Sequence, residues 1–424
     1  MNRINRALAF YEKCVYWLLV FLFPTQFSYH FWPDFSFIFG IKVDYLSPTV
    51  YLTDLLVVLL VILSRSRFNL FIKDKFKKRN AKLLILSLLG VGTAIVVGNI
   101  LEATTPLVAA IKWIKIIELL TLALYAYINK KSNKETLYAL YFSIIFFSLI
   151  GILQFVLQKT IGGPLYLLGE RQFSLITPGI ALAKINGVDY LRAYSTFPHP
   201  NAFAGYLGVG VVLVALMNCT IRLFNKKQLW VFYLVSSIAF FLTFSSGALV
   251  AGSITAVYFL LNKKNKEIKT KIVQLLFLLF ICLSLITPVF WKLYGDKISM
   301  PESVGLRLAQ AEAAMNMFKN HALWGVGLNN FILSVRDNIV VGTSLFIQPA
   351  HNVYLLLLTE IGAVGFIFFV AVVFLALNKL DRKYIPIFIY ILVTSFVDHY
   401  WLTLQQNLLL LFFVLGISLQ KENR

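Results

Sequence analysis

Apolar stretches of about 20 residues recur along the whole chain, and this pattern restricts its fold more than any motif does. A stretch of that length can cross a lipid bilayer as a helix. The chain has 59% hydrophobic and only 14% charged residues, which excludes an ordinary soluble protein. We predict an all-α polytopic membrane protein with about twelve transmembrane helices. They are expected at residues 14–32, 47–64, 81–98, 106–128, 137–158, 200–219, 229–245, 247–262, 272–290, 351–377, 384–398 and 402–420.

Lys and Arg residues alternate between dense and sparse loops along this map. When both termini are placed in the cytoplasm, most of the 39 basic residues fall on cytoplasmic segments, led by 65–82 and 263–271. The positive-inside rule requires this distribution, so the helix count and the orientation support each other. The net charge of +20 is then explained by short loops that face anionic membrane lipids. No nucleic-acid partner is expected, because no soluble basic domain is present.

Several ionisable residues lie inside predicted helices far from any motif, where charge is costly unless it is paired or lines a cavity. They are Asp54, Lys112, Lys115 and Glu118. Lys115 and Glu118 are three residues apart on one helix, so we expect them to pair. The three cysteines lie within or at the inner ends of predicted helices, and no disulfide, metal cage or thiol nucleophile is predicted.

Two long segments, 159–200 and 291–350, face outward on this map and interrupt the serpentine pattern. Loops of this length are usually functional or disordered, and the composition of these two does not indicate disorder. In the second, apolar residues recur at helical spacing between 304 and 318, which predicts a helix that carries Arg307. Gly325 and Gly327 then predict a tight turn.

His351 stands at the mouth of the predicted helix 351–377. An imidazole titrates near neutral pH and can accept a proton from a hydroxyl, so His351 is a candidate general base at the membrane boundary. The alternative is that it only caps the helix at the interface. His199 is a second candidate base, ranked lower because Pro198 and Pro200 predict a rigid turn around it.

Three motifs occur in the order found in one membrane protein family. They are residues 192–207, with Arg-Ala-Tyr-Ser-Thr-Phe-Pro-His-Pro-Asn, residues 305–331, with Gly-Leu-Arg and His-Ala-Leu-Trp-Gly-Val-Gly-Leu-Asn-Asn-Phe, and His351-Asn352 followed by Gly362-x-x-Gly365. Together they resemble the O-antigen ligase and O-antigen polymerase family. The resemblance covers residues 190–370 well and extends over the rest of the chain only in hydropathy.

The resemblance implies a GT-C-like fold with a large outward loop before the tenth helix, in the inner (cytoplasmic) membrane of a bacterium. It implies transfer or polymerisation of an undecaprenyl-diphosphate-linked glycan on the outer side of that membrane, for lipopolysaccharide or surface polysaccharide biosynthesis. The acceptor would be a second glycan or lipid A-core. No cofactor or metal is required in the ligase branch.

The resemblance also assigns roles to residues of this chain. It implies that His351 activates the acceptor hydroxyl for an inverting displacement, with Asn352 in a supporting place. It implies that Arg307 holds the diphosphate, and Arg192 is the second candidate, since a guanidinium offers paired hydrogen bonds to phosphate oxygens. Asp398 matches an acidic position of the ligases and is expected either to orient His351 or to pair with an arginine.

One position departs from the family pattern. Many relatives carry Ser-Arg-Gly where this chain has Ser245-Ser246-Gly247, so the arginine is absent at Ser246. We expect Arg192 or Lys184 to supply that charge.

A transporter or flippase of lipid-linked glycan is the alternative function. A transporter built from two halves should repeat its hydropathy pattern, and this chain does not, since its two long loops are unequal. The choice between polymerase and ligase stays open, because no residue names the acceptor.

Overall fold

The computed structural model describes residues 3–129, 133–261, 268–294, 302–335 and 347–420, and these residues are mostly helical. The helices of the first half are α1 (Arg3–Phe21), α2 (Leu52–Leu63), α3 (Arg65–Lys77), α4 (Arg79–Leu101), α5 (Pro106–Ile128), α6 (Asn133–Leu157), α7 (Pro200–Ile221) and α8 (Lys226–Leu242). Those of the second half are α9 (Ser246–Leu261), α10 (Ile268–Tyr294), α11 (Glu302–Asn320), α12 (Phe331–Val335), α13 (Val353–Lys379), α14 (Ile385–Val397), α15 (Tyr400–Thr403) and α16 (Gln405–Ser418).

A helix overlaps each of the twelve predicted stretches, and α5 has the predicted bounds, 106–128. The predicted helix in the second outward segment is confirmed as α11. By length and composition, four helices could cross a membrane, namely α4, α6, α7 and α13. The pair α2 and α3, bent by 66°, would make a fifth. The chain is thus a helical membrane protein, while twelve spans and the GT-C-like fold stay predictions.

Two parts of the sequence map are wrong. The first predicted helix, 14–32, ends at Phe21, and strand β1 (Ser28–His30) follows it. This strand pairs antiparallel with β4 (Thr49–Tyr51), so the stretch contains a reversal that hydropathy alone does not show. Residues 65–82, predicted as a cytoplasmic loop, form α3 and the start of α4. The side chains of α3 are not buried, so it is a surface helix that a hydropathy map leaves out.

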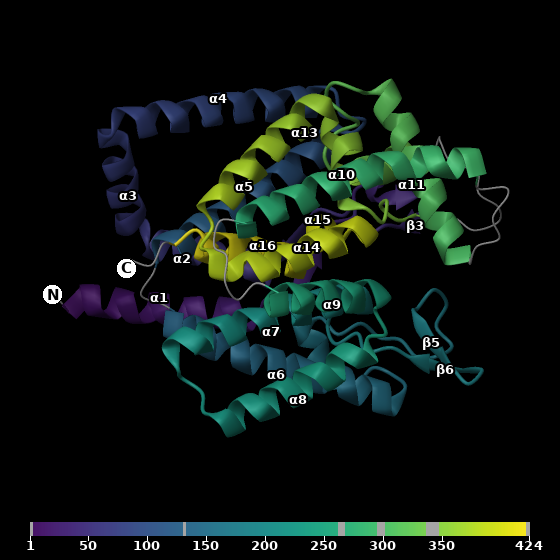
Figure 1. Cartoon of the computed structure of the whole chain (residues 1–424), viewed down its shortest axis with the longest axis horizontal. Helices are drawn as coiled ribbons and strands as arrows, with labels where there is room; N and C mark the ends of the chain where they lie inside the picture. The colour runs from purple at the N-terminus through teal and green to yellow at the C-terminus, as the bar shows by residue number, and fades with distance from the viewer. Residues whose placement is uncertain (1–2, 130–132, 262–267, 295–301, 336–346, 421–424) are drawn as a thin grey trace.

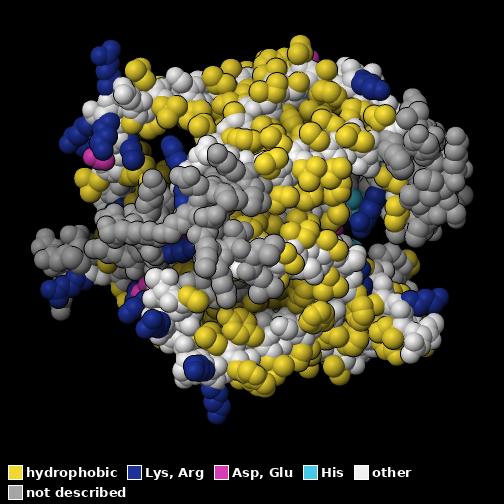
Figure 2. All heavy atoms as spheres, viewed as in Figure 1, with side chains coloured by type: hydrophobic (Ala, Val, Ile, Leu, Met, Phe, Trp, Pro, Cys, Tyr) yellow, Lys and Arg dark blue, Asp and Glu magenta, His cyan; other side chains and the backbone are white. Residues whose placement is uncertain are grey.

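Figure 1 shows most of the long helices running side by side, with the first and last described residues at the same end of the molecule. The hairpin of β5 (Leu182–Ile185) and β6 (Val188–Leu191) lies at the opposite end, which we call the loop end. Hydrophobic side chains cover much of the surface between the two ends, as expected where lipid contacts the protein (Figure 2). Near the loop end, Figure 2 shows a hollow that contains histidine and basic side chains.

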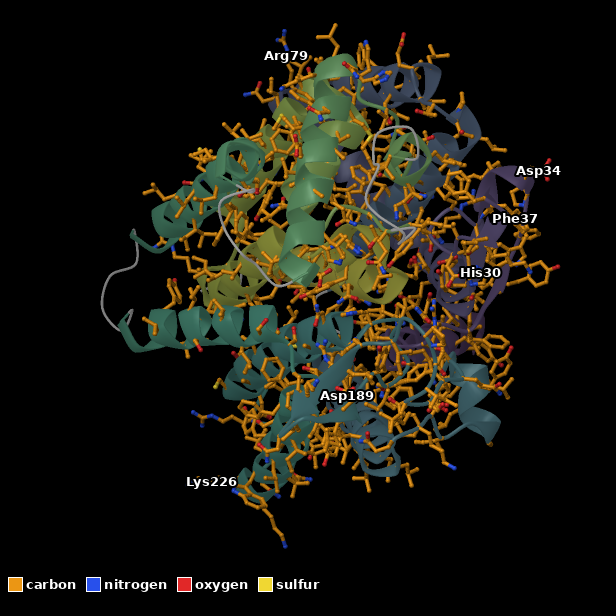
Figure 3. The ribbon with its side chains drawn as sticks, turned by 90° about the vertical axis from the view of Figure 1, so that its right-hand side faces the viewer. His30, Asp34, Phe37, Arg79, Asp189 and Lys226 are labelled. Carbon is orange, nitrogen blue, oxygen red and sulfur yellow. The ribbon has the colours of Figure 1, made fainter. Side chains whose placement is uncertain are left out.

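Short elements cover the loop end. The strands β2 (Phe37–Ile38) and β3 (Ile41–Lys42) form a small hairpin between α1 and α2, preceded by the 3₁₀ helix η1 (Asp34–Ser36). A second 3₁₀ helix, η3 (Gly163–Leu168), lies between α6 and α7. Figure 3 views the molecule from this end, with His30 and Phe37 on one flank and Asp189 of the β5–β6 hairpin nearer the centre. Short η5 (Arg382–Tyr384) precedes α14 near the other end.

Candidate active site

Helix α13 is broken at Gly362, which has φ +64° and ψ −177° inside an otherwise helical segment. The break frees backbone groups, and the glycine turn after α11 takes them up: Val326 N donates to Thr359 O at 3.0 Å and Gly327 N to Glu360 O at 3.0 Å. Beyond the break, Ala363 N donates to Ala322 O at 2.7 Å. A Cβ at Gly362 would lie 2.3 Å from the carbonyl oxygen of Leu323. The two glycine motifs are therefore one structural joint that fixes α13 against the outward segment.

Asn352 caps α13 and fixes the residue before it. Its side-chain oxygen accepts hydrogen bonds from the backbone amides of Tyr354 and Leu355, both at 3.0 Å. Its amide nitrogen donates to Ser284 Oγ at 2.9 Å and to the Phe396 carbonyl at 3.1 Å, which ties the cap to α10 and α14. The predicted support by Asn352 thus has a structural basis, because a fully bonded cap holds His351 in place.

The ring of His351 is oriented by α11. Its Nδ1 lies 2.9 Å from Gln310 Oε1. An amide oxygen can only accept, so Nδ1 carries the proton and donates, and Nε2 keeps a free lone pair. Burial lowers the pKa of His351 below its ordinary value of 6.5, partly offset by the charge of Asp398, so the ring is neutral at pH 7. A neutral, half-buried imidazole with a free lone pair is the state that a general base needs.

His199 differs from His351 at this point. It is the N-cap of α7, and its Nδ1 accepts a hydrogen bond from the Asn201 backbone amide at 3.1 Å. Its lone pair is therefore already in use. Burial lowers the pKa of His199 to about 4, so the ring stays neutral there. The hydrogen bond from Asn201 is a second reason, besides the flanking prolines, to rank His199 below His351 as a candidate base.

His399 is the site residue that sequence reasoning missed. Its ring lies edge to face against His351, with centroids 5.0 Å apart, and its other neighbour is the ring of Tyr45 at 5.7 Å. His399 Nδ1 lies 2.7 Å from Thr403 Oγ1, and burial lowers its pKa to about 3. The only signal in the sequence was its place directly after Asp398. Tyr45 could not have been found, because it comes from a connection more than 300 residues away.

Asp398 lies at the break between α14 and α15, next to both histidines. One carboxylate oxygen accepts from Asn201 Nδ2 at 2.9 Å and the other from the backbone amide of His399 at 2.8 Å. Asn201 Oδ1 in turn accepts from Arg192 at 2.7 Å. Asp398 is thus linked to an arginine through an amide, and it lies beside His351. Among the described residues Asp398 reaches Arg192 only through Asn201 and makes no hydrogen bond to His351, so both roles predicted for this carboxylate stay predictions.

The two predicted phosphate-binding arginines, Arg192 and Arg307, lie near Asp398. Arg192 also donates from Nε to the Thr243 carbonyl at 2.6 Å, just before the start of α9 at Ser246. Burial lowers the pKa of Arg192 to about 10, so it remains a cation at pH 7. Arg307 projects from α11, is exposed, and donates to the Val397 carbonyl at 3.3 Å. The structure therefore brings together all five predicted site residues.

His351, Asp398 and His399 could also hold a metal ion, since each offers a ligand atom and these atoms lie within 4.8 Å of one another. Two histidines and one carboxylate are a set that Fe, Zn or Mn accepts. The Nδ1 partners Gln310 and Thr403 would orient the rings for a metal equally well. The sequence predicted no metal here, and the donor set by itself permits one.

A cavity of about 1010 Å³ opens beside these residues. His199, His351, Asp398 and His399 line one wall, and the connection that carries Tyr45 lines another. Arg192 and Arg307 are not in the lining, but Arg307 acts electrostatically on His199, His351 and His399, and Arg192 acts on His199. An acceptor in the cavity and an anionic group at the arginines would meet at His351.

Residues 230–370 match a family model described as O-Antigen ligase. The match contains Arg307, His351 and the glycine joint, and it confirms the resemblance to the O-antigen ligase and polymerase family that the motifs predicted. Neither a curated protein nor a solved structure matches the chain.

Proposed function

We propose that this protein, through its O-antigen ligase domain, transfers a lipid-diphosphate-linked glycan to a hydroxyl acceptor. The donor would be undecaprenyl-diphosphate-linked, and the reaction would take place on the outer side of the bacterial cytoplasmic membrane, with both termini in the cytoplasm. The observation that carries the proposal is the position of His351. Its neutral imidazole lines the large cavity, has Nδ1 bonded to Gln310, and lies within electrostatic range of Arg307.

The reaction balances with the groups at the site. His351 Nε2 takes the proton of the acceptor hydroxyl, and the hydroxyl oxygen forms a bond to the anomeric carbon of the donor. The bond from that carbon to the diphosphate oxygen breaks, and the diphosphate leaves with the electron pair. Attack opposite to the leaving group inverts the anomeric configuration. Arg307 and Arg192 hold the charge that develops on the leaving group, so we propose that no metal or other cofactor is needed.

Arg192 is our candidate for the charge missing at Ser246. Its guanidinium contacts the Thr243 carbonyl, three residues before Ser246 in the chain. Lys184 lies in β5, in register with Asp189 of β6, and no described contact links it to the site. Arg192 therefore fits the compensating role and Lys184 does not.

Loss of the His351 imidazole tests the proposal. His351→Ala should lower glycan transfer by about 10²- to 10⁴-fold, because a positioned base contributes roughly 3 to 5 kcal/mol to the barrier. His351→Gln should fail almost as badly, since an amide can hydrogen-bond but cannot take the proton. The measurement is in vitro transfer by purified protein from undecaprenyl-diphosphate glycan to an acceptor.

His399→Ala and His199→Ala are the matched controls, because both rings line the same cavity. Product at the wild-type level from His351→Ala would remove His351 from the mechanism and leave His399 as the next base. Movement of lipid-linked glycan across the membrane with no new glycosidic bond would instead support the transporter.

Arg307→Lys tests the diphosphate contact. The substitution keeps the charge but loses the paired geometry, so we expect turnover to fall by about tenfold or more while membrane insertion stays normal. The same purified transfer assay measures it. Equal turnover would show that the site needs only a point charge, or that the diphosphate binds elsewhere.

A further inference from the structure

Four basic side chains line the cavity beside His351: Lys42, Lys112, Lys115 and Arg171. Three have partners. Arg171 pairs with Asp44 at 2.8 Å, Lys42 lies over the ring of Trp32, and Lys115 pairs with Asp54 and, at 3.1 Å, with Glu118 as predicted. The fourth, Lys112, has no ion pair and no hydrogen bond with any residue that the structure describes.

None of the described acidic residues of the lining forms an ion pair with Lys112. Asp44 faces Arg171, and Asp398 is held by Asn201 and the His399 amide. Glu170 accepts from the backbone amides of Ile161 and Gly162 at 2.8 and 2.7 Å. Outside the lining, Glu360 attracts Lys112 electrostatically, but its carboxylate already accepts from the Phe331 amide at 3.3 Å. Lys112 is therefore the basic residue of the lining that has no ion pair, hydrogen bond or ring contact with a described residue, and Glu360 acts on it only through electrostatic attraction.

The position of Lys112 along α5 limits the kind of anion that it could bind. Lys112 lies six residues after Pro106, the first residue of α5, which places it about 9 Å along the helix from its loop-end start. Val108, Ile111 and Leu408 form an apolar lining next to it. A charge inside a membrane span that faces a cavity is typical of a substrate path, and α5 occupies one of the spans predicted from the sequence. The apolar wall favours the phosphate of a lipid over a soluble sugar acid, which would not need that wall.

We propose that Lys112 binds the phosphate of a phosphorylated lipid acceptor, in a second anion site that includes neither Arg192 nor Arg307. The inference rests on the proposed function, in which the arginines hold the diphosphate of the donor. The acceptor hydroxyl then reaches His351 from the cavity side. Two sources share this chemistry, namely a second polyprenyl diphosphate carrier and the phosphorylated disaccharide of lipid A.

The test counts bound lipid by native mass spectrometry of the purified chain in phosphatidylcholine nanodiscs, with geranylgeranyl diphosphate as the probe. We expect two bound molecules in the wild type and one in Lys112→Met, which keeps an apolar stem without the charge. The affinity of the lost site should fall by about tenfold or more. Lys112→Arg keeps the charge and should keep both sites. Arg307→Gln should lose the other molecule.

A double variant shows whether Lys112 binds the lipid phosphate or only balances the charge of Glu360. If Lys112 only balances Glu360, then Lys112→Met combined with Glu360→Gln should bind like the wild type, which would overturn the inference. We expect the double variant to bind one molecule, as Lys112→Met does. Thermal unfolding of each variant shows that it is folded before its binding is compared.

Monophosphoryl lipid A in place of the probe distinguishes the two sources. If the site that needs Lys112 binds this lipid more tightly than geranylgeranyl diphosphate, the acceptor is a lipid A-type molecule, and the reverse would identify the carrier. If neither lipid binds in a Lys112-dependent way while Arg307→Gln still loses one, only the inference fails. If the wild type binds no diphosphate at all, the proposed function fails with it.

Discussion

Helices α4 and α13 are both long and apolar enough to cross a membrane, yet they have opposite places in the molecule. Only 11% of the most apolar window of α4 is buried, against 33% for α13. In Figure 1, α4 lies along one edge of the molecule, whereas α13 passes beside α10 and α14. Helix α13 is broken at Gly362 and begins just after His351, and α4 is continuous. Hydropathy therefore locates a helix, while a few polar and glycine residues decide whether it serves the site.

A hydrogen bond joins the two helices at a buried residue, Asn99 of α4. Its amide nitrogen donates to the carbonyls of Trp324 and Glu360 at 2.7 and 2.8 Å. Its oxygen accepts from Trp113 Nε1 at 2.9 Å and from the Leu328 amide at 3.0 Å. The loop end of α4 thus joins the glycine joint of α13. The exposed remainder of α4 is free of such contacts and has the surface that a lipid-facing helix needs.

The two helices should differ most in how much stability they lose when a glycine is replaced by alanine. Gly362→Ala places a Cβ against backbone atoms at a residue with positive φ, so we expect a loss of about 3 kcal/mol or more of folding free energy. Gly90→Ala is the matched control in α4, where a Cβ would meet nothing within 4 Å, and it should leave stability equal or slightly higher. Thermal unfolding in detergent measures both.

Similar melting temperatures for Gly362→Ala and Gly90→Ala would contradict the rigid joint. A folded Gly362→Ala protein with normal transfer activity would also show that the break in α13 does not position His351.

A smaller effect is expected at the contact between the two helices. Asn99→Ala removes a fully buried amide and leaves its backbone partners without hydrogen bonds, which should cost roughly 1 to 3 kcal/mol of stability. Asn99→Asp is the companion variant, because it keeps the acceptor for Trp113 and Leu328 and loses the donor. If neither variant changes the unfolding temperature, α4 does not support the site through Asn99.

The smallest expected effect is on the pH dependence of the transfer rate, through His351 at the start of α13. Burial lowers the pKa of His351 below 6.5, so the neutral base is fully present at pH 7 and above. The transfer rate should therefore be flat from neutral to mildly alkaline pH and fall only as acid protonates the ring. The charge of Asp398 raises the pKa of His351, so Asp398→Asn should move the acid limb to lower pH.

The comparison is between rate profiles of the wild type and Asp398→Asn measured with saturating donor. An acid limb at the same pH in both proteins would show that His351 is not the titrating base. A limb that moves to higher pH would show that the carboxylate acts on a different group.

The sequence by itself determined the class of the protein and the parts of its site that lie in continuous motifs. Apolar length and charge distribution act locally, so they predicted the helices, and α5 to its bounds. Arg192, Arg307, His351 and Asn352 lay in motifs that resemble a family, and the structure brings them together. Hydropathy failed where an apolar segment turns back on itself, as at β1, because side-chain polarity does not record a strand pairing.

Only the tertiary structure decided how the site works, because its decisive contacts join residues far apart in the chain. The free lone pair of His351 depends on Gln310, and the engaged lone pair of His199 depends on its place as a helix cap. His399 joins the site because α14 ends beside α13. Lys112 and Lys115 are alike in the sequence, yet packing gives carboxylates to Lys115 alone. The proposed acceptor site depends on a cavity whose lining contains Lys112 and His351 but neither arginine, and only the tertiary structure brings that lining together.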